Sequence, residues 1–461
     1  VTLDPAWLYG TLRSLESTSA RPARYVLALS GGLDSTVLLH LLAGTREMHD
    51  VPILAVHVDH SLHAKSGQWA ADAQAFAGSL GVACDIVRVD VGRDGGPEAA
   101  AREARYAALR GLMRDGDWLL SAHHRDDQAE TLLLNLMRGS GPDGLAAMPV
   151  SRRFGPGRLV RPLLSVTRET LQAYAGAEAL SWTDDPSNAD TAFDRNFLRR
   201  EVLPALAKRW PDSIARIAQS ATHLGDVGDL LQEVAKADLA AMNATPGRVP
   251  VSRLLALGRE RRAQVLRRAA DHAGLPKPTA RALREILSSM LDARDDASPV
   301  VHWAGAECRR YRDTLYLAPV RPVPAFDGLA LARDVPAALG AGFGTLTLTM
   351  QPGTGLDPAR VAGGLVLRQR AGGEEIKPFG QRHTRKLKKL LQERGVLPWL
   401  RDALPLVYAG DTLVAVGDLW IAADAAATPG LGLRWDGAPD SLESPVDGPP
   451  RLSARGRSDN V

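Results

Sequence analysis

One short loop in this chain has the residue types that bind phosphate groups. Its two adjacent glycines can take positive φ angles and let the backbone come close to a ligand. The helix expected after the loop offers N–H groups and the positive end of its dipole to an anion. Hydroxyl donors flank the glycines, and the single carboxylate can hold Mg²⁺ beside phosphates. The loop consists of Ser30, Gly31, Gly32, Leu33, Asp34 and Ser35.

The loop matches neither of the two common phosphate motifs. It lacks the Gly-x-x-x-x-Gly-Lys of Walker A and the Gly-x-Gly-x-x-Gly of dinucleotide sites. For the hexapeptide by itself, a tight serine-capped turn between a strand and a helix is an equal alternative. Its position directly after an apolar run, together with a second polar motif, favours a phosphate site and hence an enzyme that consumes ATP.

The second polar motif, residues 123–131, reads His-His-Arg-Asp-Asp-Gln-Ala-Glu-Thr. Asp127 and Glu130 are three residues apart, which places both carboxylates on one face of a helix. Such a pair suits Mg²⁺ or the ammonium group of a substrate. The alternative is an acidic helix start with solvated neighbours, which is common for a lone Asp-Asp but not for so dense a cluster.

Alternating strands and helices are expected to bring the two motifs together. Short apolar runs separated by amphipathic stretches predict an α/β fold with a doubly wound parallel sheet. Ligands bind at the carboxyl edge of such a sheet, where both motifs should lie. Strands are predicted over 25–29, 53–58, 86–91 and 118–122, and helices over 35–42, 66–80 and 98–113.

The rest of the chain divides into further predicted parts. Residues 1–215 form the catalytic domain, 216–335 a mainly helical domain, and 345–425 a small α+β domain. Within the second part, helices are expected over 212–243 and 251–291, and a hairpin over 300–317. The stretch 437–461, rich in Pro, Ser, Gly and Asp, is predicted to be a disordered tail.

Composition sets outer limits on the function. The chain has 461 residues, of which 45% are hydrophobic and 24% charged, with a net charge of +3. No apolar run approaches the roughly 18 residues of a membrane span, so no membrane association and a cytoplasmic location are expected. Cys84 and Cys308 are the only cysteines. They can form neither a disulfide framework nor a cysteine-based zinc or iron–sulfur site.

Several motifs together resemble one enzyme family. The loop at 30–35 is similar to the pyrophosphate loop of the N-type ATP pyrophosphatases, which have a Rossmann-like fold. The combination with the other motifs resembles the tRNA(Ile)-lysidine synthetases, over most of residues 20–215 and 364–422. These motifs are 123–131, Arg161-Pro162-Leu163, Asp185-Pro186-Ser187-Asn188, Arg195-Asn196, Lys386–Gln392 and Pro398–Arg401.

The resemblance implies a specific reaction. Members of this family attach L-lysine to C2 of the wobble cytidine in the isoleucine tRNA that has a CAU anticodon. They use ATP and Mg²⁺, adenylate the cytidine O2 with release of pyrophosphate, and then displace AMP with the lysine ε-amine. A carbonyl oxygen leaves poorly until it is adenylated, so the order is chemically reasonable. The oligomeric state is open, with a homodimer as one option.

The resemblance also implies roles for individual residues. The loop would hold the ATP phosphates, with Asp34 and Asp127 as metal ligands. Asp127 and Glu130 would recognise the lysine ammonium or the metal. Arg195 would lie near the substrates, with helix capping or tRNA contact as alternatives. Arg102 and Arg105 resemble a family segment near the nucleotide, although a solvated helix face explains isolated arginines better.

A basic segment near the C-terminus predicts contact with RNA. Residues 377–401 contain eight lysines and arginines but a single acidic residue, Glu393. Phosphates supply most of the affinity for nucleic acids, so Lys386, Lys388 and Lys389 are the expected tRNA contacts. The alternative is a solvated basic helix. Trp399, which could stack on bases, is better explained as part of the core.

Two positions depart from the family pattern, and two other functions compete with it. His63 stands where an arginine is usual, and Leu397 replaces a proline. A different ATP pyrophosphatase, such as a tRNA thiolase, would need cysteines that this chain lacks. A non-catalytic RNA-binding protein would not need the intact loop or the acidic motif.

Overall fold

The computed structural model divides the chain into two compact units, residues 1–231 and 232–461. Each unit has its own apolar core. No helix within the described part of the chain is both long and apolar enough to cross a membrane. The structure describes residues 2–16, 20–61, 63, 65–90, 97–183, 190–294, 299–322 and 324–439.

The first unit contains a six-stranded sheet in the order β3-β2-β1-β4-β6-β5. Every neighbouring pair is parallel except β5 with β6. This arrangement confirms the parallel α/β sheet expected from the alternation of apolar and amphipathic runs. The strands are β1 (Arg24–Ala28), β2 (Ile53–Asp59), β3 (Ala83–Arg88), β4 (Asp117–Leu120), β5 (Ser151–Phe154) and β6 (Gly157–Val160).

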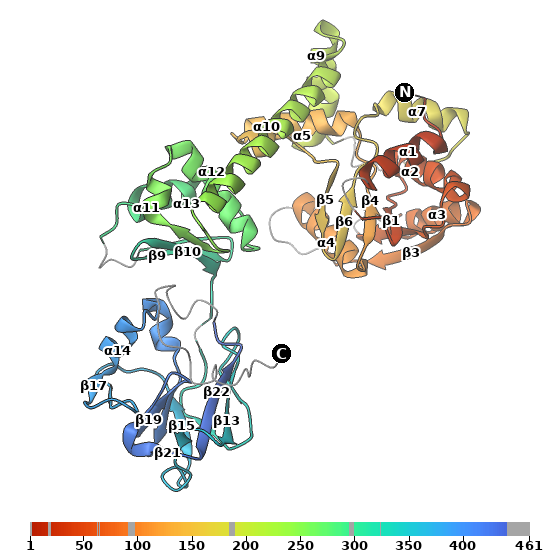
Figure 1. The fold of residues 1–461 in the computed structure, drawn as a ribbon. Coiled ribbons are helices and arrows are strands. Elements are labelled where there is room, and N and C mark those ends of the chain that lie inside the picture. The colour runs from red at the N-terminus through yellow and green to blue at the C-terminus, as the bar shows by residue number, and fades with distance from the viewer. Residues whose placement is uncertain are drawn as a thin grey trace, which may run out of the picture. The chain divides into compact units, whose positions relative to one another are not determined.

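Helices cover both faces of this sheet because side chains alternate along each strand. Tyr25 and Leu27 of β1 belong to one apolar cluster, whereas Val26 between them belongs to another. Helices α1, α2, α3 and α7 contribute to the first cluster and α4 to the second (Figure 1). These helices are α1 (Pro5–Glu16), α2 (Leu33–Gly44), α3 (Ser66–Ser79), α4 (Pro97–Leu112) and α7 (Arg168–Ala177).

Two parts of the sheet differ from the prediction. β3 begins at Ala83, not at Ile86, because its side chains are mostly exposed and its apolar pattern therefore marks its limits poorly. The β5–β6 hairpin was not expected, since two arginines interrupt the apolar pattern of its first short strand. Gly157 allows β6 to pair with β4, because a Cβ there would lie 2.2 Å from the carbonyl oxygen of Asp117.

A helical segment and a small sheet follow. α10 (Ser213–Ala241) carries the chain from the first unit into the second, close to the predicted limits of 212–243. The predicted hairpin over 300–317 consists of three strands, because Ala304 and Gly305 both take positive φ and form an additional turn. The elements are α11 (Val251–Leu255), α12 (Arg259–His272), α13 (Ala280–Glu285), η4 (Ile286–Met290), β7 (Arg248–Pro250), β8 (Val300–Trp303), β9 (Ala306–Tyr311) and β10 (Thr314–Pro319).

Two five-stranded sheets form the C-terminal part of the second unit, in the orders β11-β15-β18-β19-β20 and β12-β13-β22-β14-β21. β22 (Gly430–Asp436) pairs along its whole length with β13 (Thr345–Gln351). The predicted end at residue 425 left out this strand, whose glycines resemble a loop. From residue 440 on, the predicted tail lies outside the described residues.

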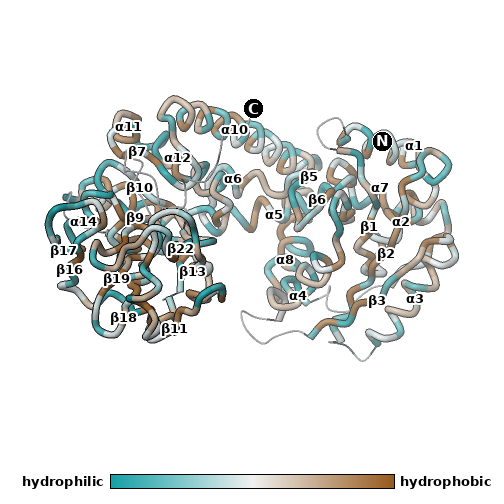
Figure 2. The backbone as a smooth tube through the Cα atoms, turned by 60° about the horizontal axis from the view of Figure 1, so that its bottom comes forward, coloured by the Kyte–Doolittle hydropathy of each residue, from teal (hydrophilic) through white to brown (hydrophobic). Residues whose placement is uncertain are grey.

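The remaining elements of this part are short. One helix, α14 (Leu387–Glu393), packs its leucines into the core. The strands are β11 (Leu329–Leu331), β12 (Ala337–Ala338), β14 (Gly355–Leu356), β15 (Leu365–Arg368), β16 (Glu375–Ile376), β17 (Arg385–Lys386), β18 (Leu406–Ala409), β19 (Thr412–Val416), β20 (Trp420–Ile421) and β21 (Ala426–Ala427). Figure 2 shows how apolar and polar residues alternate along both units.

Candidate active site

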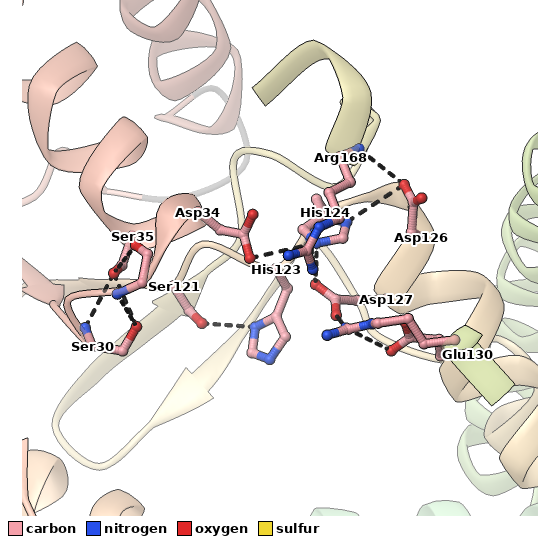
Figure 3. Close-up of polar contacts among 12 residues, drawn as sticks. Ser30, Asp34, Ser35, Ser121, His123, His124, Asp126, Asp127, Glu130 and Arg168 are labelled. Carbon is pink, nitrogen blue, oxygen red and sulfur yellow. Dashed lines mark hydrogen bonds and ion pairs between the residues drawn. The ribbon is translucent and has the colours of Figure 1, made fainter. Parts of the chain in front are cut away.

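The glycine loop joins β1 to α2 at the carboxyl edge of the parallel sheet. Gly31 has φ of +81°, a conformation that favours glycine. The Ser35 hydroxyl donates to the Gly32 carbonyl oxygen at 3.0 Å and accepts from the Ser30 N–H at 3.2 Å (Figure 3). Gly32 is the N-cap of α2 and supplies no side-chain cap. The first N–H groups of the helix are therefore available to an anion without a competing side-chain cap.

A buried histidine links this loop to the second motif. The Nε2 atom of His124 lies 3.6 Å from Asp34 Oδ2 and 3.4 Å from Asp127 Oδ2. Its Nδ1 atom lies 3.5 Å from Asp126 Oδ2. Burial by itself would lower the pKa of His124, but the surrounding carboxylates raise this pKa to about 10. A positively charged ring thus holds Asp34 of the loop beside the start of α5 (Arg125–Met137).

Two arginines neutralise the acidic pair of α5. Glu130, whose side chain is 0% exposed, accepts at 2.7 Å from Nε of Arg195 and at 2.7 Å from Nε of Arg199. Asp127 Oδ1 accepts from the same guanidinium groups at 3.0 and 3.2 Å. The arginines belong to α8 (Asp194–Phe197) and the π-helical turn η3 (Leu198–Val202). Two acids and two bases from distant parts of the chain form one ion-pair network.

This network limits what the two carboxylates can bind. Both oxygens of Glu130 accept from arginine, and Asp127 Oδ2 also accepts from the backbone N–H of His124 at 2.9 Å. Burial raises the pKa of Asp127, but His124 and Arg195 lower it below its ordinary value. Asp127 is therefore an anion that already has its partners.

Asp34 is better suited to a metal than Asp127. Its Oδ1 atom is buried and has no hydrogen-bond partner among the described residues. Mg²⁺ at a nucleotide site takes only one or two protein carboxylates, and phosphates and water complete its shell. Within the described part of the chain, no three His, Cys, Asp or Glu side chains are grouped as a metal site. A single free carboxylate oxygen beside a phosphate loop fits Mg²⁺ bound together with a nucleotide.

A second histidine has the opposite character. His123 accepts or donates at Nδ1 with the Ser121 hydroxyl at 2.7 Å. Burial is the main cause that lowers the pKa of His123 to about 3. Its ring is therefore neutral at pH 7, whereas its neighbour His124 is charged. Arg161, which is 3% exposed, donates to the Pro149 carbonyl oxygen at 2.8 Å and adds positive charge near His123.

The two arginines expected near the nucleotide lie on α4. Arg105 donates from Nε to Nε2 of His60 at 3.2 Å. The Arg102 guanidinium lies over the Tyr106 ring, 5.1 Å from its centroid. Both residues are exposed, and within the described part of the chain neither forms a hydrogen bond or ion pair with the glycine loop. Their nucleotide-binding role stays a prediction.

A small cavity of about 120 Å³ lies beside Glu130. Its polar wall carries both signs of charge, with the carboxylates Asp126 and Glu130 and the guanidinium groups Arg168 and Arg199. Its apolar wall comes from α9 (Leu203–Arg209) and the start of α10. The apolar lining residues are Leu203, Pro204, Ala207 and Ile214.

The sequence interpretation missed three members of this site. Arg199 follows Arg195 by four residues, which places both arginines on one face of a helix, as the spacing of three does for Asp127 and Glu130. This spacing could have indicated Arg199 as a second partner of the acidic pair. His124 and Asp126 were quoted within the second motif without roles. Only the fold shows that they connect the glycine loop with α5 and α7, where Asp126 accepts from the Arg168 backbone N–H at 3.0 Å.

The basic segment of the second unit presents its lysines to solvent. Lys386, Lys388 and Lys389 are exposed, whereas the leucines between them are buried. Arg385 forms an ion pair with Glu393, the one acidic residue of the segment. Trp399 is half-buried, and its ring centroid lies 5.5 Å from that of Tyr316. Leu397, the departure from the proline pattern, is completely buried in the same core.

Family models match three consecutive regions of the chain. A PP-loop domain matches residues 11–206, a TilS substrate binding domain matches 250–316, and a TilS substrate C-terminal domain matches 365–435. The tRNA(Ile)-lysidine synthase of Alkalilimnicola ehrlichii is 42% identical over 413 residues, which are 89% of this chain and 92% of that protein. The chain belongs to the tRNA(Ile)-lysidine synthase family.

Other members of this family are similarly close. The tRNA(Ile)-lysidine synthase of Methylococcus capsulatus is 41% identical over 88% of this chain and 94% of its own length. That of Salmonella agona is 39% identical over 92% of this chain and 99% of its own length. The motifs in the sequence therefore pointed to the correct family, and the PP-loop domain indicates use of ATP.

Among solved structures, a U34-tRNA thiolase from Methanococcus maripaludis covers 48% of this chain and 80% of its own, at 19% identity and a TM-score of 0.40. So distant a likeness says nothing about function.

Both cysteines of the present chain are free thiols, with Cys308 completely buried.

Proposed function

We propose that the protein ligates L-lysine to C2 of the wobble cytidine in the CAU-anticodon isoleucine tRNA, with ATP converted to AMP and pyrophosphate. One observation carries the proposal beyond family membership. An uncapped phosphate loop is joined through the Asp34–His124–Asp127 contacts to α5, which borders a mostly apolar cavity with charged residues in its wall. The tRNA substrate also agrees with the cytoplasmic location expected from the sequence.

The chemistry has two steps with complementary needs. The cytidine O2 attacks the α-phosphorus of ATP, and the bond to pyrophosphate breaks. The lysine ε-amine then attacks C2, the bond from C2 to O2 breaks, and AMP leaves with that oxygen. Both steps depend mainly on positioning and on neutralisation of phosphate charge.

The glycine loop would hold the phosphates during the first step. Backbone N–H groups at the start of α2 donate to no capping side chain and can donate to phosphate oxygens. Mg²⁺ held at Asp34 would neutralise charge on the pyrophosphate that leaves. Arg102 and Arg105 would supply further positive charge from α4, and Asp127 would support the metal site indirectly through His124.

The cavity beside Glu130 has the features that bind lysine. The partly exposed carboxylate of Asp126 can attract the ammonium group, and the guanidinium groups can attract the carboxylate of the amino acid. The apolar wall can pack against the four methylene groups of the side chain. Because Glu130 is already paired with Arg195 and Arg199, it holds these arginines in place and presents only part of its charge to lysine.

The ε-ammonium must lose a proton before the nitrogen can attack. His124 cannot take this proton at pH 7, because its carboxylate neighbours keep it protonated. His123 is neutral, as burial keeps its pKa low, and has one ring nitrogen that Ser121 does not occupy. So low a pKa makes His123 a weak base, and it does not line the cavity, so we assign the proton transfer to neither histidine.

Incubation with radiolabelled lysine, ATP and the CAU-anticodon isoleucine tRNA tests the proposal. Nucleoside analysis should show label at a modified cytidine, and a tRNA with a different anticodon should stay unlabelled. Pyrophosphate release should require tRNA. Binding of the tRNA without either product would indicate a non-catalytic RNA-binding protein instead. Light scattering of the same sample would establish whether the enzyme is a homodimer.

A further inference from the structure

Arginines gather on the free edge of the sheet in the first unit. Arg152 and Arg153 lie on the edge strand β5, Arg158 on β6, and Arg110 on the neighbouring helix α4. Figure 2 shows β5 as a hydrophilic segment of the sheet. We call Arg110, Arg152, Arg153 and Arg158 the arginine strip.

No carboxylate neutralises the arginine strip. Within the part of the chain that the structure describes, none of the four forms an ion pair with Asp or Glu, and Arg158 donates only to the Ser151 hydroxyl, at 2.9 Å. Arginines on the other side of the unit are different, since Arg13 pairs with Glu16 and Arg21 with Asp50. The strip therefore keeps its full positive charge for a partner.

Two arginines of the strip face each other across the hairpin. Arg153 of β5 is the direct register partner of Arg158 of β6. Like charges in this position destabilise a sheet, by roughly 0.2–1 kcal/mol relative to neutral pairs. The protein gains no folding free energy from this arrangement. A polyanion bound across both side chains would remove the repulsion.

On the opposite face of the hairpin, the Phe154 ring holds the other two guanidinium groups in position. Arg110 lies 5.2 Å and Arg152 5.8 Å from the centroid of the Phe154 ring. Phe154 in turn packs edge-on against Tyr106. Stacking orders a guanidinium group through its flat face and leaves its N–H groups at the rim free to donate. Phosphate oxygens are the acceptors that match such a planar set of donors.

The strip runs toward the active site. The N–H of Arg161 donates to the Val150 carbonyl oxygen at 2.8 Å, which continues the pairing of the hairpin to the carboxyl edge of the sheet. On α4, Arg102 lies two turns before Arg110, with Tyr106 between them. Eight residues of helix span about 12 Å. On the α4 face, Arg110 and Arg102 therefore carry positive charge from beside Phe154 toward the edge with the glycine loop, whereas Arg153 and Arg158 lie on the opposite face of the sheet.

We propose that the arginine strip binds backbone phosphates of the anticodon stem and thereby delivers the wobble nucleotide to the glycine loop. This inference rests on the proposed function, because it presupposes a tRNA substrate. A stem bound along the strip would leave its loop at the carboxyl edge of the sheet. The lysines of α14 belong to the second unit and would contact the tRNA elsewhere.

Binding to two RNAs tests the inference with the full-length protein. The first RNA is the complete tRNA, and the second is a hairpin that contains only the anticodon stem and loop. The test variant is Arg110→Gln/Arg152→Gln/Arg153→Gln, in which the glutamine stems still cover Phe154. The charge-preserving variant has Lys at the same three positions. The control is Arg13→Gln/Arg21→Gln, which removes positive charge from the other face of the unit.

The Gln variant should lose affinity for both RNAs, and the slope of log K against log salt should flatten by up to about 0.7–0.9 for each lost phosphate contact. The Lys variant should keep most of the affinity and the salt slope. The control should match wild type. Equal binding of the hairpin by wild type and the Gln variant, at an unchanged salt slope, would overturn the inference. So would an equal loss in the control.

The two proposals fail in different ways. A wild-type enzyme that binds tRNA but never labels cytidine would refute the proposed function and leave the strip testable by binding alone. A Gln variant with a normal circular dichroism spectrum and undiminished hairpin binding would refute the strip, even if lysidine still formed. If the variant instead lost affinity for an acidic protein surface but not for RNA, the strip would be a protein-docking site and the inference wrong.

Discussion

Replacing Glu130 by glutamine should destabilise the first unit strongly. Glu130 is completely buried and accepts from two guanidinium groups, at 2.7 Å from each Nε and at 3.1 Å from one terminal nitrogen of Arg199. A glutamine side chain has the same shape, but its amide NH₂ would point at an arginine donor. Two buried positive charges would then share the single carboxylate of Asp127.

The magnitude follows from the burial of this network. Removal of one partner from a buried ion pair costs about 3–5 kcal/mol, and the two arginines here would keep only Asp127 as a counter-ion and are only 25% and 28% exposed. For a unit of 150–250 residues, each kcal/mol lowers the melting temperature by about 2–4 °C. The first unit contains 231 residues. Its unfolding transition should therefore fall by roughly 6–20 °C.

Scanning calorimetry of the full chain can measure this shift, with Glu47→Gln as a control that makes the same chemical change at an exposed position. The lysine KM should rise more than the ATP KM, since the displaced arginines line the lysine cavity. A melting temperature within about 1 °C of the control, with a lysine KM raised as expected for a loss of about 2–5 kcal/mol, would refute the structural role. Glu130 would then be a direct ligand of the ammonium group.

Three further outcomes are expected. Asp34→Ala should fold normally, as judged by circular dichroism, but lose at least about 100-fold in turnover, and near-normal turnover would remove Asp34 from the phosphate site. Because His123 stays neutral in the folded protein down to a pKa of about 3, the unfolded state takes up more protons below its ordinary pKa of 6.5. The free energy of unfolding should thus decrease as the pH drops from 6.5 to about 3, by at most about 1.4 kcal/mol per pH unit. His123→Asn should show a smaller decrease in melting temperature over the same pH range. Lys386→Ala/Lys388→Ala/Lys389→Ala should flatten the salt dependence of tRNA binding by up to about 0.7–0.9 per contact while turnover at saturating tRNA survives. An unchanged slope would exclude α14 as an RNA surface.

Local signals in the sequence were sufficient for the sheet and the family. The glycine loop and the motif at 123–131 both follow apolar runs, and parallel strands bring such positions to one edge. The loss of pattern in β5 and β22 has a physical cause, because arginines or glycines replace the alternating apolar residues that mark a strand. Pairing with strands that are distant in the sequence then determines where such a strand forms, and no local sequence pattern predicts this pairing.

The ion-pair network was less predictable than the loop. Asp127 and Glu130 could be recognised by their spacing, but their partners lie 65 to 72 residues further along the chain. The sequence interpretation assigned the two acids to metal or substrate because it had no means to count the hydrogen bonds that each oxygen accepts. The sequence had named Asp34 and Asp127 as metal ligands, and only the structure shows that Asp34 alone of the three carboxylates has a buried oxygen without a partner among the described residues.

The separation of the acids from their arginines also affects how the protein folds. All six strands of the central sheet end by Val160, whereas α8 begins at Asp194, so synthesis completes the strands before the arginines. The strands around the glycine loop can pair before α8 docks. Until then, the adjacent negative charges of Asp127 and Glu130 repel each other on α5 and weaken that helix. A newly synthesised chain should therefore complete its central sheet first and assemble its lysine cavity last.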